Sequence, residues 1–146
     1  MKSILFVCLG NICRSPLAEG IAKEYVKNNN LDIEIDSCGT SSWHVGEAPC
    51  DNSIKIAHIQ NIDISIQRAR QITKDDLNRF ETIIALDSSN YENLLKMGCP
   101  KNKLSKLGFY GYNSEDVPDP YFFDGFEGFE KVYEMIDICV KRLIDE

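Results

Sequence analysis

The chain has 146 residues, of which 43% are hydrophobic and 27% are charged, so it can form one folded domain over residues 1–146 but not two independent cores. Its 16 basic and 23 acidic residues give a formal net charge of −7. That charge argues against nucleic acid or an anionic membrane as a partner, because both are polyanions. No apolar run approaches the ~18 residues of a membrane span. Without a secretory signal, the six cysteines are expected to stay reduced in the cytoplasm.

The first predicted strand is the continuous apolar run from Ser3 to Cys8, which is typical of a buried parallel strand. It ends at Gly10 and Asn11, two residue types that tolerate tight turns. A helix is then predicted to start at Ser15-Pro16, because proline fits the first helical turn and a serine hydroxyl can cap free amides.

The rest of the chain continues to alternate between strand and helix patterns. Strands are predicted near residues 33–37, 82–87 and 104–107, and helices near 49–60, 88–98 and 126–143, with residues 73–76 as the capped start of a further short helix. This alternation favours a three-layer α/β fold of the flavodoxin-like or Rossmann-like kind, with a four-stranded parallel sheet. Ligands on such sheets bind at the carboxyl ends of the strands, which is where Cys8 lies.

The stretch from Cys8 to Pro16 joins the end of the first strand to the start of a helix. Successive backbone N–H groups in such a loop can surround an oxyanion, and the helix dipole favours negative charge there. A thiolate is also stabilised in this setting, so Cys8 is a candidate nucleophile. Arg14 can hold two oxygens of a phosphate with its planar fork, and Ser15 can hydrogen-bond the sulfur. Taken singly, Cys8 could be a small core residue and Arg14 a surface cation.

Five segments together resemble the low-molecular-weight protein tyrosine phosphatases, and they extend over nearly the whole chain. They are residues 7–16 (VCLGNICRSP), 36–37 (DS), 70–73 (RQIT), 86–90 (LDSSN) and 119–122 (DPYF). The resemblance implies a phosphotyrosine-protein phosphatase with acid phosphatase activity, a cysteinyl-phosphate intermediate, and no metal or other cofactor. It also implies inhibition by inorganic phosphate or vanadate, with Cys8 as nucleophile, Arg14 as phosphate clamp and Asp119 as general acid.

Asp119 also makes chemical sense without the family, because a phenolate leaving group benefits from a proton delivered by a positioned acid. The alternative is that Asp119 belongs to a solvated acidic loop. Trp43, Tyr121 and Phe122 are aromatic residues on predicted loops, where rings more often bind ligands than fill a core. They could wall a slot for a phenyl ring, or they could pack the loops onto the domain.

Further site residues are carried over from the resemblance. The substrate pocket would include Leu9, Gly10, Ile12 and Cys13 of the cysteine loop, and His44 beside Trp43 would lie near the substrate peptide. The family's hydrogen-bond network would be supplied by Asn11, Ser15 and Ser37. Where the family carries a histidine in this network, the present chain has Gln67, which can donate and accept hydrogen bonds but cannot ionise.

Cys13 lies five residues after Cys8 in a tight loop. If their Cβ atoms come within about 4.5 Å, peroxide is expected to produce a reversible Cys8–Cys13 disulfide. The alternative is that Cys13 only packs under the loop.

Three other functions fit parts of the same pattern. An arsenate reductase of this fold would need a further redox cysteine pair downstream, but residues 86–96 contain no cysteine and Cys99 is single. Protein-arginine phosphatases carry a small threonine where this chain has Ile12, and the bulkier side chain favours a flat aromatic substrate. A non-catalytic phosphate or FMN carrier would have no use for a nucleophile and an acid.

A zinc site is not expected, because no paired C-x₂-C spacing occurs.

Overall fold

The computed structural model describes residues 2–120 and 125–146. Its centre is a sheet of four parallel strands in the order β2-β1-β3-β4. The strands are β1 (Ser3–Cys8), β2 (Glu34–Gly39), β3 (Thr82–Ala85) and β4 (Leu104–Lys106). The predicted parallel α/β sheet is therefore confirmed, and β1 lies in its interior with both edges hydrogen-bonded.

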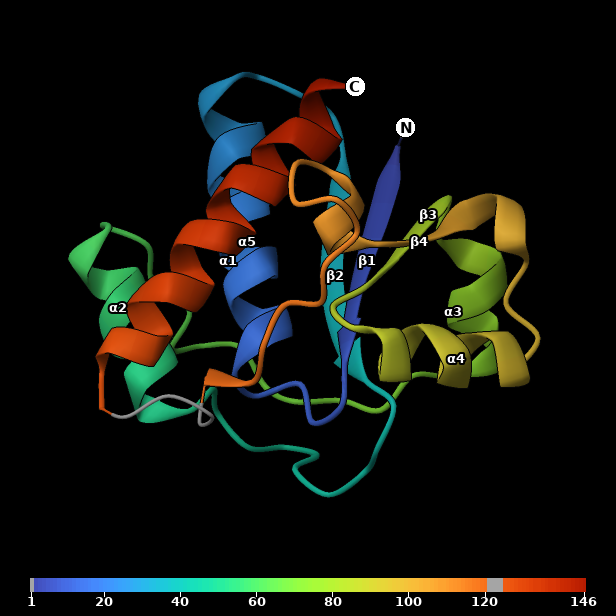
Figure 1. The fold of residues 1–146 in the computed structure, drawn as a ribbon, viewed down its shortest axis with the longest axis horizontal. Helices are drawn as coiled ribbons and strands as arrows, with labels where there is room; N and C mark the ends of the chain where they lie inside the picture. The colour runs from blue at the N-terminus through green and yellow to red at the C-terminus, as the bar shows by residue number, and fades with distance from the viewer. Residues whose placement is uncertain (1, 121–124) are drawn as a thin grey trace.

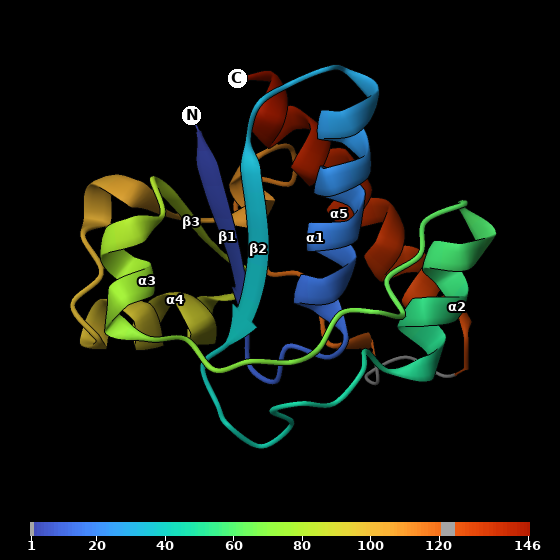
Figure 2. The same ribbon diagram turned by 180° about the vertical axis from the view of Figure 1, so that it is seen from behind.

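Helices cover both faces of this sheet and complete the three layers (Figure 1, Figure 2). One face carries α1 (Arg14–Asn28) and α5 (Glu127–Asp145), with α2 (Asp51–Ile59) packed on both of them. The other face carries α3 (Lys74–Arg79) and α4 (Ser88–Lys96). All five helices lie where the sequence predicts helices, and each buries at least one apolar side chain against the sheet or a neighbouring helix.

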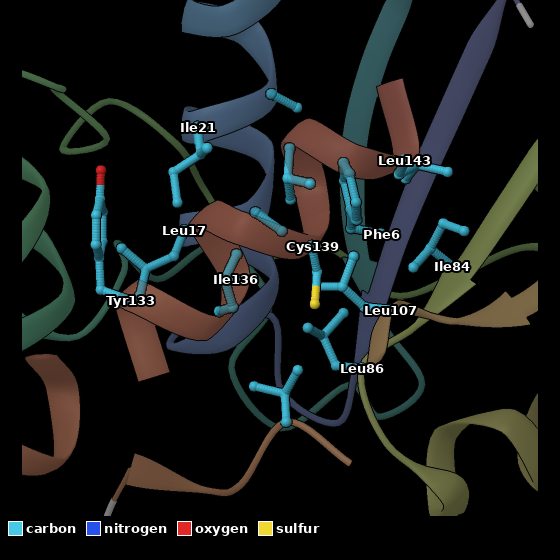
Figure 3. Packing of buried hydrophobic residues seen from close by; sticks show 14 of the residues in the cluster. Phe6, Leu17, Ile21, Ile84, Leu86, Leu107, Tyr133, Ile136, Cys139 and Leu143 are labelled. Atoms are coloured by element: carbon cyan, nitrogen blue, oxygen red, sulfur yellow. The ribbon is translucent and has the colours of Figure 1, made fainter. Parts of the chain in front are cut away.

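Alternating side chains of β1 divide the core into two clusters. Phe6 points toward α1 and α5, where Figure 3 shows it beside Cys139 and Leu143, and Leu5 points into the smaller cluster beneath α3 and α4. A strand whose two faces are both covered must be apolar throughout, which explains the unbroken hydrophobic run at the start of the sequence. Burial on both faces also fixes the register of the strand and hence the position of Cys8 at its end.

The start of one helix departs from the sequence-based prediction, and a second helix, which starts at Ser88 as predicted, has a cap that was not predicted. Helix α1 begins at Arg14 with Cys13 at its N-cap, so Ser15 is not the capping residue. Helix α4 is capped by Asp87, whose side chain accepts a hydrogen bond from the backbone N–H of Asn90. The Ser15 prediction was wrong because this hydroxyl has tertiary partners, described below, that compete with the local backbone.

Within residues 2–120 and 125–146, no helix combines the length and apolarity needed to cross a membrane. Two predicted aromatic site residues, Tyr121 and Phe122, lie outside the described residues.

Candidate active site

The loop from Leu9 to Cys13 leaves the end of β1 and turns into the first residue of α1. Its turn depends on Asn11, whose φ of 57° lies in the left-handed region that asparagine tolerates better than most residues. The end of β2 lies directly against this loop. A Cβ atom on Gly39 would come within 2.7 Å of the Leu9 carbonyl oxygen, so only glycine permits this close approach.

The Cys8 side chain is 3% exposed and makes two polar contacts inside this loop. Its Sγ lies 3.0 Å from Ser15 Oγ, and the Asn11 backbone N–H donates to Sγ over 3.3 Å. Both groups can donate a hydrogen bond to this sulfur, so the loop surrounds it with donors. The predicted contact between Ser15 and the sulfur is present.

Asn11 and Ser37 connect the cysteine loop to β2. Asn11 Nδ2 donates to Ser15 Oγ over 2.7 Å and to Ser37 Oγ over 2.9 Å. Ser37 Oγ in turn donates to Glu19 Oε1 over 2.6 Å, and Glu19 also accepts a hydrogen bond from Lys23 Nζ. Glu19 is 5% exposed and was not singled out from the sequence. It is the one charged residue in a buried, otherwise non-polar stretch of α1 (residues 17–22), a signal that only the position of Ser37 makes interpretable.

Gln67 is the residue that stands where the family resemblance led us to expect a histidine. Its Nε2 donates to the carbonyl oxygen of Pro16 over 3.1 Å. The observed hydrogen bond of Gln67 therefore supports the first turn of α1, whereas the buried acid of the adjoining network is Glu19.

Two hydrogen-bond acceptors from distant parts of the chain hold the side chain of Arg14. Its Nη1 donates to Asp87 Oδ2 and to the Val117 carbonyl oxygen, each over 2.8 Å. Both bonds use the same nitrogen, so they orient the guanidinium while leaving its Nε–Nη2 edge for an oxyanion. Asp87 thus has two structural roles, since it also caps α4. No sequence pattern indicates this pairing, because 73 residues separate the partners.

A cavity of about 220 Å³ opens above the sulfur of Cys8. It brings together the end of β1, the loop after β2 and the loop before residue 121, and it is lined by Cys8, Leu9, Gly10, Ile12, Cys13, Arg14, Trp43, His44, Asp119 and Pro120. Trp43 is 74% exposed and forms part of the rim. The His44 ring lies 2.9 Å from Glu47, measured between Nδ1 and Oε2. The three residues with proposed chemistry, Cys8, Arg14 and Asp119, therefore share one cavity.

Arg70 ties the cysteine loop to one acidic residue of β2 and one of α3. Its backbone N–H donates to Asn11 Oδ1 over 3.1 Å, and its guanidinium binds Asp36 and Asp76 over 3.0 and 2.9 Å. Burial raises the pKa of Asp76, but hydrogen bonds from Arg70 and Thr73 lower it by more, so the pKa lies below the ordinary value. Ionised Asp76 is therefore part of the folded structure.

This lowered pKa predicts that acid weakens the fold. A carboxyl group whose pKa is lower in the folded state stabilises the protein above its unfolded pKa of about 3.9, and that stabilisation is lost as the pH falls through the folded value. We expect Asp76→Asn to lower the free energy of unfolding at pH 7 by ~1–3 kcal/mol, with a smaller difference at pH 3. Urea unfolding at both pH values measures this, with exposed Asp75→Asn as control. A difference that does not change with pH would contradict the assignment.

Residues 3–146 match the family described as low molecular weight phosphotyrosine protein phosphatase. The chain is 41% identical to the low molecular weight protein-tyrosine-phosphatase PtpA of Staphylococcus aureus, over 99% of this chain and 93% of that protein. It superimposes on the crystal structure of YfkJ from Bacillus subtilis with a TM-score of 0.90 and 38% identity, covering 99% and 93% of the two chains. A Drosophila arginine phosphatase gives a TM-score of 0.90 and 35% identity, covering 99% and 96%.

Proposed function

Because this chain belongs to the low molecular weight phosphotyrosine protein phosphatase family, whose members work through a cysteinyl phosphate, we propose that Cys8, Arg14 and Asp119 carry its reaction. The observation that supports this assignment is that all three side chains line the cavity at the end of β1. Arg14 is fixed by Asp87 and Val117, so its charge is oriented before substrate arrives.

In the first step the Cys8 thiolate attacks phosphorus, and the bond from phosphorus to the phenolic oxygen breaks. Asp119 gives its proton to that leaving oxygen. In the second step a water molecule attacks the phosphocysteine, Asp119 takes the proton of the water, and the phosphorus–sulfur bond breaks. The departing sulfur returns as a thiolate that accepts hydrogen bonds from Ser15 and the Asn11 N–H. Arg14 balances the charge on the equatorial oxygens throughout.

The substrate class we propose is protein phosphotyrosine. Leu9, Ile12 and Trp43 give the cavity an apolar wall on which a phenyl ring can lie. The similarity to an arginine phosphatase makes phosphoarginine the second candidate, although the isoleucine at position 12 favours a flat ring. Parallel assays with phosphotyrosine and phosphoarginine peptides decide between them, and a larger kcat/KM for phosphoarginine would overturn the preference.

A metal-free assay tests the proposed mechanism. We expect turnover of p-nitrophenyl phosphate to continue in excess EDTA and to be inhibited competitively by inorganic phosphate or vanadate. One equivalent of iodoacetate is expected to inactivate the enzyme by labelling Cys8, and bound phosphate is expected to slow that labelling. A requirement for a divalent cation would contradict the proposal.

The proposed compartment is the cytoplasm, since reducing conditions keep the Cys8 thiol available.

A further inference from the structure

Two cysteines from distant parts of the chain meet beside the cysteine loop. Cys13 directly precedes Arg14, and Cys50 directly precedes α2, 37 residues further along the sequence. Both are present as thiols, and their Sγ atoms are 2.7 Å apart. A disulfide bond measures about 2.05 Å, so the two sulfurs need to move together by only about 0.65 Å to bond.

Backbone hydrogen bonds hold these two residues against each other. The Cys50 N–H donates to the Ile12 carbonyl oxygen over 2.8 Å, which places the start of α2 on the cysteine loop. Ser53 Oγ donates to the Cys13 carbonyl oxygen over 3.1 Å and also lies 3.1 Å from Cys50 Sγ. Ser53 is fully buried between them. These hydrogen bonds therefore hold the two cysteines next to each other independently of the contact between their sulfurs.

Solvent reaches this pair more readily than it reaches the cysteines of the core. Cys13 lines the catalytic cavity, and Cys50 lines a surface groove formed by residues 47–52 together with Ile12. By contrast, Cys38, Cys99 and Cys139 are at most 5% exposed, and burial raises the pKa of each of these thiols. Oxidants that act on thiolates therefore have easier access to Cys13 and Cys50 than to those three.

We propose that Cys13 and Cys50 are a redox modification site at which a peroxide forms an intramolecular disulfide. One thiolate attacks the peroxide oxygen, the O–O bond breaks, and a sulfenic acid and hydroxide form. The second thiol attacks that sulfenic sulfur and expels its oxygen. Two thiols and one hydrogen peroxide thus give one disulfide and two water molecules, with two electrons passing from sulfur to the peroxide oxygens. A dithiol reductant reverses the reaction by exchange.

This disulfide would compete with the Cys8–Cys13 disulfide predicted from the sequence, since the single sulfur of Cys13 can bond to only one partner. Pairing with Cys50 leaves Cys8 as a thiol and ties the cysteine loop to α2. Closing a 37-residue separation also restricts the unfolded chain, so the oxidised protein is expected to unfold at a temperature about 5–10 °C higher.

Peptide mapping of the full chain tests the proposal independently of catalysis. Wild type and Cys8→Ser are treated with hydrogen peroxide, blocked with N-ethylmaleimide and digested without reduction. We expect a Cys13–Cys50 linked peptide in both proteins, lost after dithiothreitol, and a raised unfolding temperature in oxidised Cys8→Ser. Absence of this peptide from Cys8→Ser, or a wild type in which Cys13 links only to Cys8, would overturn it. Loss of activity in the wild type would not contradict the proposal, because peptide mapping detects the disulfide directly.

Two matched variants complete the experiment. Cys50→Ser removes the partner thiol while retaining the fold, because Cys50 has the extended backbone of a helix N-cap, a position that serine favours. It is expected to lose both the linked peptide and the rise in unfolding temperature. Cys99→Ser, which changes a buried cysteine outside the pair, is expected to retain both. A Cys50→Ser protein with native circular dichroism and an unchanged temperature shift would contradict the proposal.

Discussion

Cys8→Ser is expected to lower the turnover of p-nitrophenyl phosphate by at least about 10⁴-fold while the protein stays folded and continues to bind phosphate. A serine hydroxyl is far less acidic than a thiol, and Ser15 and the Asn11 N–H stabilise an anion here without supplying a base that removes the proton. Arg14 and its two acceptors are untouched by the change, so the affinity for inorganic phosphate should be preserved. Single-turnover kinetics and calorimetric titration with phosphate measure the two effects.

Cys99→Ser provides the matched control, since it alters another buried cysteine in the cluster on the opposite face of the sheet. It is expected to retain activity within a few-fold of the parent. If Cys8→Ser retained more than a tenth of the parental turnover, Cys8 would not be the nucleophile. A loss of phosphate affinity together with turnover would instead indicate that the cysteine loop had collapsed.

Asp119→Asn is expected to slow phosphoenzyme formation by about 10²–10⁴-fold for an aryl phosphate with a poor leaving group. An amide cannot donate the proton that a phenolate needs, whereas a leaving group that departs without protonation should be affected much less. Asp119 lines the cavity above Cys8 and Arg14, which is the position that this proton transfer requires. Rapid-quench measurements with a series of aryl phosphates of increasing leaving-group pKa give the dependence directly.

Glu115→Gln is the control for Asp119, because Glu115 is an exposed acid of the same loop. It is expected to leave the leaving-group dependence unchanged. Asp87 and Asp116 are poorer candidates for the acid, since Asp87 pairs with Arg14 and Asp116 accepts hydrogen bonds from Lys106 and Ser88. An Asp119→Asn variant with full rate on the poorest leaving group would show that another group supplies the proton.

Local patterns in the sequence predict the sheet, the helices and the position of Cys8. An unbroken apolar run predicts a strand covered on both faces, and a turn of glycine and asparagine after it must lead into the next helix. Those patterns are local, so they can be recognised without knowing which segments are neighbours. No strand order was predicted from these patterns, because pairing of β1 with both β2 and β3 is set by packing of distant helices.

The contacts that orient the site were decided by the tertiary structure. Ser15 has the local pattern of a helix cap, but its hydroxyl contacts Cys8 and Asn11 after the loop folds back. The pairing of Arg14 with Asp87 and that of Cys13 with Cys50 join residues 73 and 37 positions apart. Hydrogen bonds and sulfur contacts act over about 3–4 Å, so no spacing in the sequence reports these two long-range pairings. They arise only when the sheet brings the ends of its strands to one edge.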